Sequence, residues 1–233
     1  FFFSCITPSA GGGQPAQVYF MRKDGIDAAV SVPVMILVTI TYKLVLVLFA
    51  LGVLIVRPAS VLTALKPVRL WCMLGILLNV LFISFYILLV MCPGAVDRML
   101  RWCIRHPGRL LGSQRIEKLE AWLTRWMAQY RNVSTCFGKK PLMLLRVTLL
   151  TVLQRCLLFA VTYIAMRSFG LTSGGIATVV TLQAMISLGT DLLPLPGGMG
   201  ASETMFMKIF PALCGKTLTL PVLIVSRGIS YYG

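Results

Sequence analysis

Residues 192–207, LLPLPGGMGASETMFM, place two prolines, three glycines and a glutamate between long apolar runs. Proline removes a helical hydrogen bond and glycine weakens a helix, so an unbroken helix through this stretch is disfavoured. A second stretch of the same kind, PSAGGGQPAQVYFM, occupies residues 8–21. The two stretches therefore predict two interruptions in a chain that is otherwise suited to long apolar helices.

The composition places both interruptions in a membrane protein. Of the 233 residues, 58% are hydrophobic and 12% are charged, and the mean hydropathy is +0.86. An ordinary soluble domain is less apolar and about twice as charged. The length suits a single all-α polytopic membrane domain, 1–233, of about six helices at ~20 residues per crossing. The chain opens on FFFSCITP and ends on SRGISYYG, which we interpret as a fragment of a longer protein.

Three apolar segments, residues 28–56, 70–92 and 142–166, are long enough to cross a bilayer as full helical spans. Weaker apolar stretches at 174–193 and 217–233 flank the first motif quoted above. The second of these predicts a last span that is cut short by the end of the chain.

A basic stretch at residues 93–141 separates the second and third spans. It holds ten Lys and Arg residues against three acids, so the positive-inside rule predicts a cytoplasmic loop. The short loop at 57–69 then lies outside, although its three basic residues oppose the rule. Within the basic loop, apolar residues recur every three or four positions over 113–131. This spacing predicts an amphipathic helix that lies either in the headgroup region or against its own loop.

The two interruptions align with each other when the first proline of each is superimposed, and in both the glycines are followed by Phe-Met and a basic residue. Because three spans separate them, the second copy is expected to be inverted relative to the first. The predicted fold is therefore an inverted repeat in which two broken or re-entrant helices, at 1–27 and 174–214, meet near the midplane. Plain loops at the membrane surface are the alternative. The expected helix breaks are Pro8, Gly11, Gly12, Gly13, Pro194, Pro196, Gly197, Gly198 and Gly200.

Five charged residues lie where the hydrocarbon core is expected. Lys43, Arg155 and Arg227 fall inside spans, and Asp191 and Glu203 bracket the second break. A charge at this depth costs about 2.5–3.5 kcal/mol, so such residues usually face a polar cavity and pair or bind something. Purely structural ion pairs are the alternative. Glu203 can instead cap the helix in which it lies.

Helical character resumes after each glycine cluster, which points a helix N-terminus with free N–H groups into the expected cavity. An anionic phosphate is the natural guest of such a terminus.

Other site types find little support in the residues. The seven cysteines are scattered and the single histidine, His106, lies in the basic loop, so no metal site, catalytic nucleophile with its base or cofactor site is predicted. The net charge of +15 is concentrated in one inter-helix segment. That concentration indicates membrane orientation and anionic lipid rather than nucleic acid.

Two motifs near the end of the chain resemble a known family. PLPGGMGASE at 194–203 and VSRGISYY at 225–232 are similar to the carboxyl-terminal signature of the lysylphosphatidylglycerol synthase transmembrane family. This is the flippase-like membrane region of the bacterial multiple peptide resistance factor and its stand-alone relatives. The resemblance covers nearly all of the chain. The first break departs from the signature, because GGGQPAQ lacks the acidic residue of GGMGASE.

The resemblance implies a lipid flippase-like protein of the bacterial plasma membrane that moves lysyl-phosphatidylglycerol or a related lipid to the outer leaflet. Such transport gives resistance to cationic antimicrobial peptides. On this reading Arg155, Arg227 and Lys43 attract the lipid phosphate. The carboxylates of Asp191 and Glu203 attract the lysyl amines.

Full-length relatives also carry a cytoplasmic domain that transfers lysine from its tRNA to phosphatidylglycerol. The basic loop at 93–141 is too short to fold as such a domain. One alternative is thus the membrane part of a phosphatidylglycerol lysyltransferase whose synthase domain lies outside this chain, in cis or in trans. Others are a transporter of polyprenyl phosphate or another lipid, and a membrane scaffold without transport.

Overall fold

The structure is a computed structural model that describes residues 13–105, 123–124, 127–128, 141–191, 193 and 198–232. Within these ranges the chain is helical and contains no strand. The helices are α2 (Gly13–Lys23), α3 (Ala28–Val56), α4 (Ala59–Leu65), the 3-10 turn η1 (Lys66–Val68), α5 (Arg69–Met91), α6 (Pro93–Arg105), α8 (Pro141–Ser168), α9 (Ile176–Thr190), α10 (Ala201–Ile209), α11 (Pro211–Arg227) and the π-helical turn η3 (Gly228–Tyr232).

The chain divides into two compact units. One comprises Phe1–Gly13, Thr41–Leu81 and Val147–Gly233, and the other comprises Gln14–Ile40 and Phe82–Arg146. The interactions analysed below as a site all lie within the first unit.

Four helical segments are long and apolar enough to cross a membrane. They are Val30–Val56, Ala59–Leu88, Pro141–Ser168 and Pro211–Ser230. The prediction of an all-α polytopic membrane protein is thereby confirmed. Helix α9 is also apolar, but with 15 residues it is shorter than a full crossing.

Helix α8 shows how these helices suit a lipid environment. Only 6% of its most apolar window is buried. Large apolar side chains cover its exposed surface, among them Leu145, Leu149, Leu153 and Leu157. In water such a surface would be an aggregation hazard, whereas in a bilayer it faces acyl chains at no cost.

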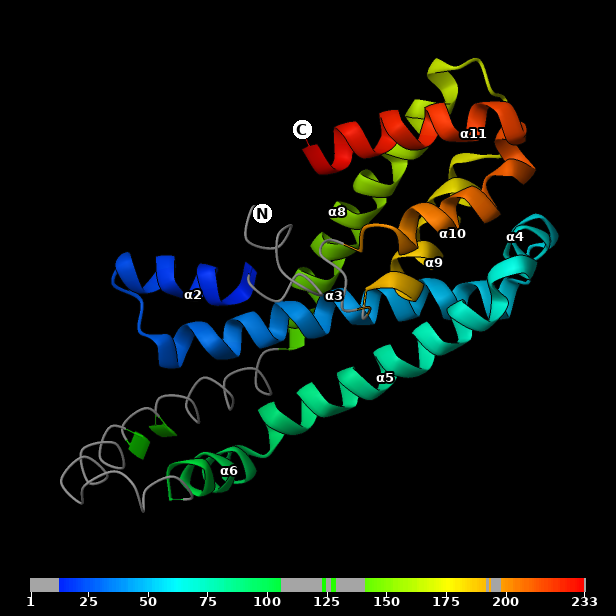
Figure 1. Ribbon diagram of the computed structural model, residues 1–233. Helices are drawn as coiled ribbons and strands as arrows, with labels where there is room; N and C mark the ends of the chain where they lie inside the picture. The colour runs from blue at the N-terminus through cyan, green and yellow to red at the C-terminus, as the bar shows by residue number, and fades with distance from the viewer. Residues whose placement is uncertain are drawn as a thin grey trace. The chain divides into compact units, whose positions relative to one another are not determined.

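The second interruption separates α9 from α10, as Figure 1 shows. Of its expected break residues, Gly198 and Gly200 adopt positive φ angles of 68° and 85°, a region that side-chain-bearing residues rarely enter. Pro194, Pro196 and Gly197 lie outside the described residues. The chain then re-enters a helix at Ala201.

The first interruption is described only from Gly13, which is the first residue of α2. Pro8, Gly11 and Gly12 lie outside the described residues. The inverted repeat therefore stays a prediction.

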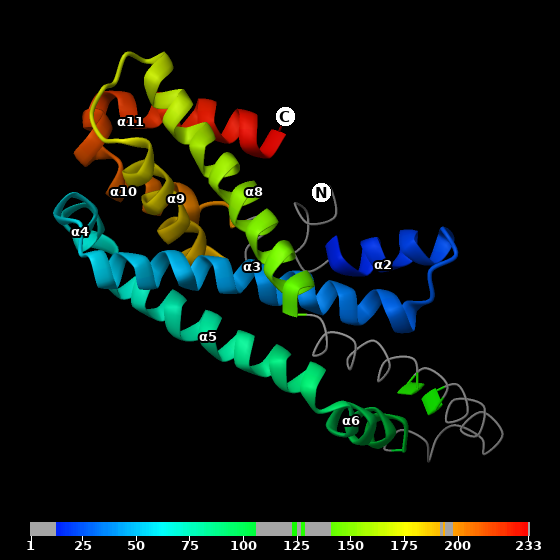
Figure 2. The same cartoon turned by 180° about the vertical axis from the view of Figure 1, so that it is seen from behind.

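Helix α10 contacts both α9 and α11 in the first unit, and Figures 1 and 2 show the three helices together from opposite sides. Its buried face carries Phe206, whose ring stacks on that of Phe210 with a centroid distance of 3.9 Å. Helix α11 begins at Pro211, and Gly215 at φ 69° interrupts its regular backbone. These contacts fix the residues on either side of the second break.

Two glycines allow helices to approach closely. A Cβ atom on Gly75 of α5 would lie 2.6 Å from the carbonyl oxygen of Leu188 in α9, and a Cβ on Gly189 of α9 would lie 3.0 Å from the side chain of Met205 in α10. The buried Asn79 amide donates to the carbonyl of Gly75 at 2.9 Å and to that of Leu188 at 3.3 Å. Small residues and an interhelical hydrogen bond are the usual means of joining helices in lipid.

The basic loop expected at 93–141 contains a helix that the sequence analysis missed. Helix α6 occupies Pro93–Arg105, and its apolar residues Val96, Met99 and Cys103 recur at spacings of three and four. The amphipathic helix expected at 113–131 lies largely outside the described residues. Its four described residues are helical, and two of them, Leu123 and Met127, are buried.

We expect Gly75→Ala to lower the stability of the protein by about 1–3 kcal/mol, because the added methyl group forces α5 away from the α9 backbone. Thermal unfolding in detergent, followed by size-exclusion chromatography, measures the change. Gly52→Ala in α3 is the matched control, since a Cβ there meets nothing within 4 Å. Equal unfolding temperatures for Gly75→Ala and Gly52→Ala would contradict the close approach.

Candidate functional site

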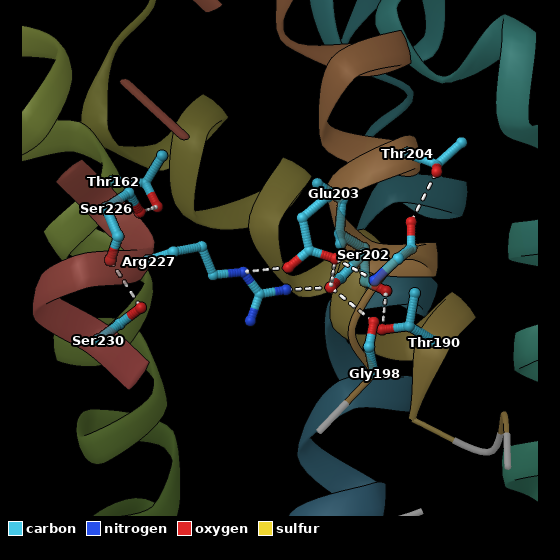
Figure 3. Close-up of polar contacts among 11 residues, drawn as sticks. Thr162, Thr190, Gly198, Ser202, Glu203, Thr204, Ser226, Arg227 and Ser230 are labelled. Carbon is cyan, nitrogen blue, oxygen red and sulfur yellow. Dashed lines mark hydrogen bonds and ion pairs between the residues drawn. The ribbon is translucent and has the colours of Figure 1, made fainter. Parts of the chain in front are cut away.

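Glu203 and Arg227 form an ion pair between α10 and α11. The Arg227 Nε atom lies 3.2 Å from Glu203 Oε1, and the two side chains are 24% and 32% exposed. A second guanidinium nitrogen of Arg227 donates to the Ser202 hydroxyl oxygen. Figure 3 shows these contacts together with the neighbouring hydroxyl groups. The pair is therefore ordered yet reachable from outside the protein.

The glycine turn before α10 holds Glu203 in place. Its Oε2 atom accepts a hydrogen bond of 2.6 Å from the backbone N–H of Gly200. The buried Ser202 hydroxyl lies 2.8 Å from the carbonyl oxygen of Gly198 and 3.0 Å from Glu203 Oε2. The carboxylate thus caps α10 and pairs with Arg227 at the same time, so the two roles left open by the sequence are compatible.

This capping bond changes one expectation about anions. The N-terminus of α10 was expected to offer free N–H groups to a phosphate, but the N–H of Gly200 already donates to the Glu203 carboxylate. The positive end of the helix is therefore already partly neutralised. A phosphate at this position would compete with the Glu203 carboxylate.

A cavity of about 720 Å³ opens beside the ion pair. Its polar lining includes Glu203, Arg227, Lys208 and Thr204. Its apolar walls come from Met199, Met207, Leu220, Leu223 and Ile224. The volume is that of a small-molecule site, and the mixture of both charges with apolar walls suits an amphiphile.

Lys43 and Asp191 form a second and more deeply buried pair. The Lys43 Nζ atom lies 2.5 Å from Asp191 Oδ2, with side-chain exposures of 7% and 18%. The Tyr42 hydroxyl donates to the other carboxylate oxygen at 3.2 Å. This pair connects the middle of α3 to the residue directly after α9, where the second break begins.

Arg155 reaches the same cluster from α8. Its guanidinium carbon lies 4.1 Å from the centre of the Tyr42 ring, a cation–π contact. The Arg155 Nε atom is buried and has no hydrogen-bond partner among the described residues. A buried N–H donor without a partner is costly, so Arg155 retains the capacity to donate to a ligand.

The five charged residues singled out in the sequence are all placed by the structure, and they form two groups. Lys43, Asp191 and Arg155 share contacts through Tyr42, whereas Glu203 and Arg227 meet on α10 and α11. The pairing of cations with carboxylates agrees with the expectation for charges at this depth.

Sequence reasoning missed several residues of these groups. Tyr42 immediately precedes Lys43 in the sequence. A tyrosine next to a lysine inside an apolar span could have been recognised as part of the same polar cluster. Lys208 is the basic residue that follows Phe-Met in the second interruption, and this position alone did not indicate a site. Ser202 gave no signal of its own, because its role depends on the turn that brings Gly198 near.

Comparison with known proteins gives one match. A family model described as lysylphosphatidylglycerol synthase TM region matches residues 1–233, the whole chain. No curated protein and no solved structure matches the chain.

We expect Asp191→Asn to destabilise the protein by about 3 kcal/mol, because it leaves the Lys43 ammonium buried without its counter-charge. Replacing both partners, as Lys43→Met with Asp191→Asn, should recover most of this loss, since no unpaired charge then remains. Thermal unfolding of the wild-type protein and these two variants in detergent measures the effect.

Arg227→Gln serves as the comparison, because it breaks the more exposed pair and should destabilise the protein less than Asp191→Asn does. If the double variant is as unstable as Asp191→Asn alone, the buried pair does not account for the loss.

Proposed function

The chain belongs to the lysylphosphatidylglycerol synthase transmembrane family, and from this premise we propose that it moves an aminoacylated phosphatidylglycerol across the membrane to the outer leaflet. Lysyl-phosphatidylglycerol is the proposed lipid, the bacterial plasma membrane the proposed location, and resistance to cationic antimicrobial peptides the proposed consequence. The observation that carries the proposal is the cavity beside Glu203 and Arg227, which offers both charges next to apolar walls.

The chemistry of this cavity complements the headgroup. Lysyl-phosphatidylglycerol combines one anionic phosphate with two lysyl amines on a diacyl lipid. Arg227 and Lys208 supply cations for the phosphate, and Glu203 supplies a carboxylate for an amine. The apolar wall of the cavity includes Leu220 and Ile224, which are exposed and suited to acyl chains.

The Glu203–Arg227 pair is less buried than the Lys43–Asp191 pair. A headgroup that brings both charges can therefore reach it and supply a new counter-charge to each side chain as the pair separates. The phosphate then replaces Glu203 beside Arg227, and an amine replaces Arg227 beside Glu203. Ser202 and Gly200 keep the carboxylate in position during this exchange.

The buried Lys43–Asp191 pair takes a different part in the proposal. Separating it would leave two buried charges without counter-charges, which costs several kcal/mol. We therefore assign Lys43 and Asp191 to holding the start of the second break against α3. Arg155 stays a candidate for the phosphate because its buried Nε atom lacks a partner among the described residues.

A second candidate follows from the description of the family itself, which refers to a synthase. In that case the chain is the membrane part of a phosphatidylglycerol lysyltransferase, and a synthase domain outside it makes the lipid. The cavity would then bind the lipid without transporting it. Measuring lipid synthesis separately from lipid exposure distinguishes the two functions.

We expect Arg227→Gln and Glu203→Gln each to lower the appearance of lysyl-phosphatidylglycerol in the outer leaflet roughly tenfold, the effect of one lost charge-assisted hydrogen bond. The measurement uses cells in which a separate synthase makes the lipid, so that this protein is needed only for its movement. A membrane-impermeant amine-reactive label reports the exposed fraction.

Lys23→Gln is the matched control, because Lys23 is an exposed cation at the end of α2 and does not line the cavity. Total lysyl-phosphatidylglycerol and protein level should stay constant in all variants. Unchanged exposure in both cavity variants would remove this site from the transport path. A fall in total lipid instead would favour the synthase-linked function.

A further inference from the structure

A second charged cavity lies at the corner where α3 ends and α5 begins. It has a volume of about 510 Å³, and Arg57, Lys66 and Arg69 all line it. These are the three basic residues of the short loop that opposed the positive-inside rule. The corner shares none of its lining residues with the Glu203–Arg227 cavity.

The three cations have no acidic residue near them in the sequence. Between Asp27 and Asp97 the chain contains neither Asp nor Glu. Among the residues that the structure describes, no carboxylate lines the cavity. Arg57 makes a local contact, since its Nε atom donates to the carbonyl of Leu54 at 3.4 Å. Three like charges around one cavity repel one another unless an anion joins them.

The backbone also favours a role for Arg57. Its φ angle of 49° is the only positive value among the described residues other than glycine. Its N–H donates to the carbonyl of Val53, which closes the last turn of α3 in the position that glycine normally occupies. The left-handed backbone conformation of Arg57 costs free energy. The Arg57 side chain lines the same cavity as the side chains of Lys66 and Arg69.

The remainder of the cavity is apolar. Val53, Leu65 and Met73 contribute to its wall, and the neighbouring surface exposes Leu62 and Leu54. Arg57 directly follows the candidate membrane span Val30–Val56, and Lys66 and Arg69 lie in the amino-terminal part of the candidate span Ala59–Leu88. Long basic side chains near the ends of spans can reach the headgroup layer. A soluble anion would satisfy the cations but not this apolar wall.

We propose that this corner binds one anionic phospholipid, with its phosphodiester on Arg57, Lys66 and Arg69 and an acyl chain along Val53, Leu65 and Met73. The ligand class is a lipid of net negative charge such as phosphatidylglycerol. An aminoacylated lipid fits poorly, because its amines meet three cations and no carboxylate. The site is therefore a fixed lipid site distinct from the proposed transport path, and it does not depend on transport.

The test is photo-crosslinking in nanodiscs of phosphatidylcholine that contain the protein and a phosphatidylglycerol probe with a photoreactive acyl chain. Mass spectrometry measures labelling within residues 53–76. We expect labelling of the wild-type protein at this corner. Each cation removed should decrease the labelling about fivefold. The variants are Lys66→Gln, the double variant Lys66→Gln with Arg69→Gln, and the triple variant that also carries Arg57→Gln. Lys66→Arg should retain the labelling.

The controls separate this site from general attraction to the membrane. Arg22→Gln with Lys23→Gln removes two exposed cations elsewhere, and Arg227→Gln alters the other cavity. In both variants the probe should label the corner as strongly as in the wild-type protein. A photoreactive phosphatidylcholine probe should label the corner several-fold less. Equal labelling by the two probes, or unchanged labelling in Lys66→Gln and the triple variant, would overturn the proposal, as would displacement of the probe by inorganic phosphate.

Discussion

Hydrocarbon offers no water to a backbone amide or to a charged side chain, and this constraint governs the whole structure. Long helices satisfy their own backbone, which is why the described residues form helices throughout. Where α9 ends and α10 begins, the freed backbone needs other partners. Glu203 and Ser202 supply some of them, through Gly200 and Gly198. The break is therefore possible only where protein groups surround it.

The same constraint explains why the two ion pairs differ in what they can do. Lys43 and Asp191 are nearly shielded, so each charge needs the other and the pair acts as a fixed link between α3 and the break. Glu203 and Arg227 are about a quarter to a third exposed, and a cavity lies beside them. A pair that outside groups can reach is able to exchange partners with a ligand. The two ion pairs thus differ in burial rather than in charge. The buried Lys43–Asp191 pair is suited to holding the fold, and the more exposed Glu203–Arg227 pair is suited to binding a ligand.

Charges without an internal partner indicate where the protein meets lipid. The cations at the α3–α5 corner face a cavity whose described lining contains no carboxylate, whereas those at the second break are paired with carboxylates of the protein. Anionic headgroups are the counter-charges that the membrane itself provides. We therefore propose that the two cavities suit lipids of different net charge, because among the described lining residues only those of the Glu203–Arg227 cavity include a carboxylate.

The sequence by itself determined the all-helical membrane class and the family, because hydropathy and the glycine-proline motif are local properties of the chain. It also indicated which charges needed explanation. The sequence analysis did not predict helix α6, because the many basic residues of this segment suggested a loop. Only the tertiary structure decided that Lys43 pairs with Asp191 and Arg227 with Glu203, since these partners are 148 and 24 positions apart. Pairing across such separations depends on how helices pack, which no local pattern encodes.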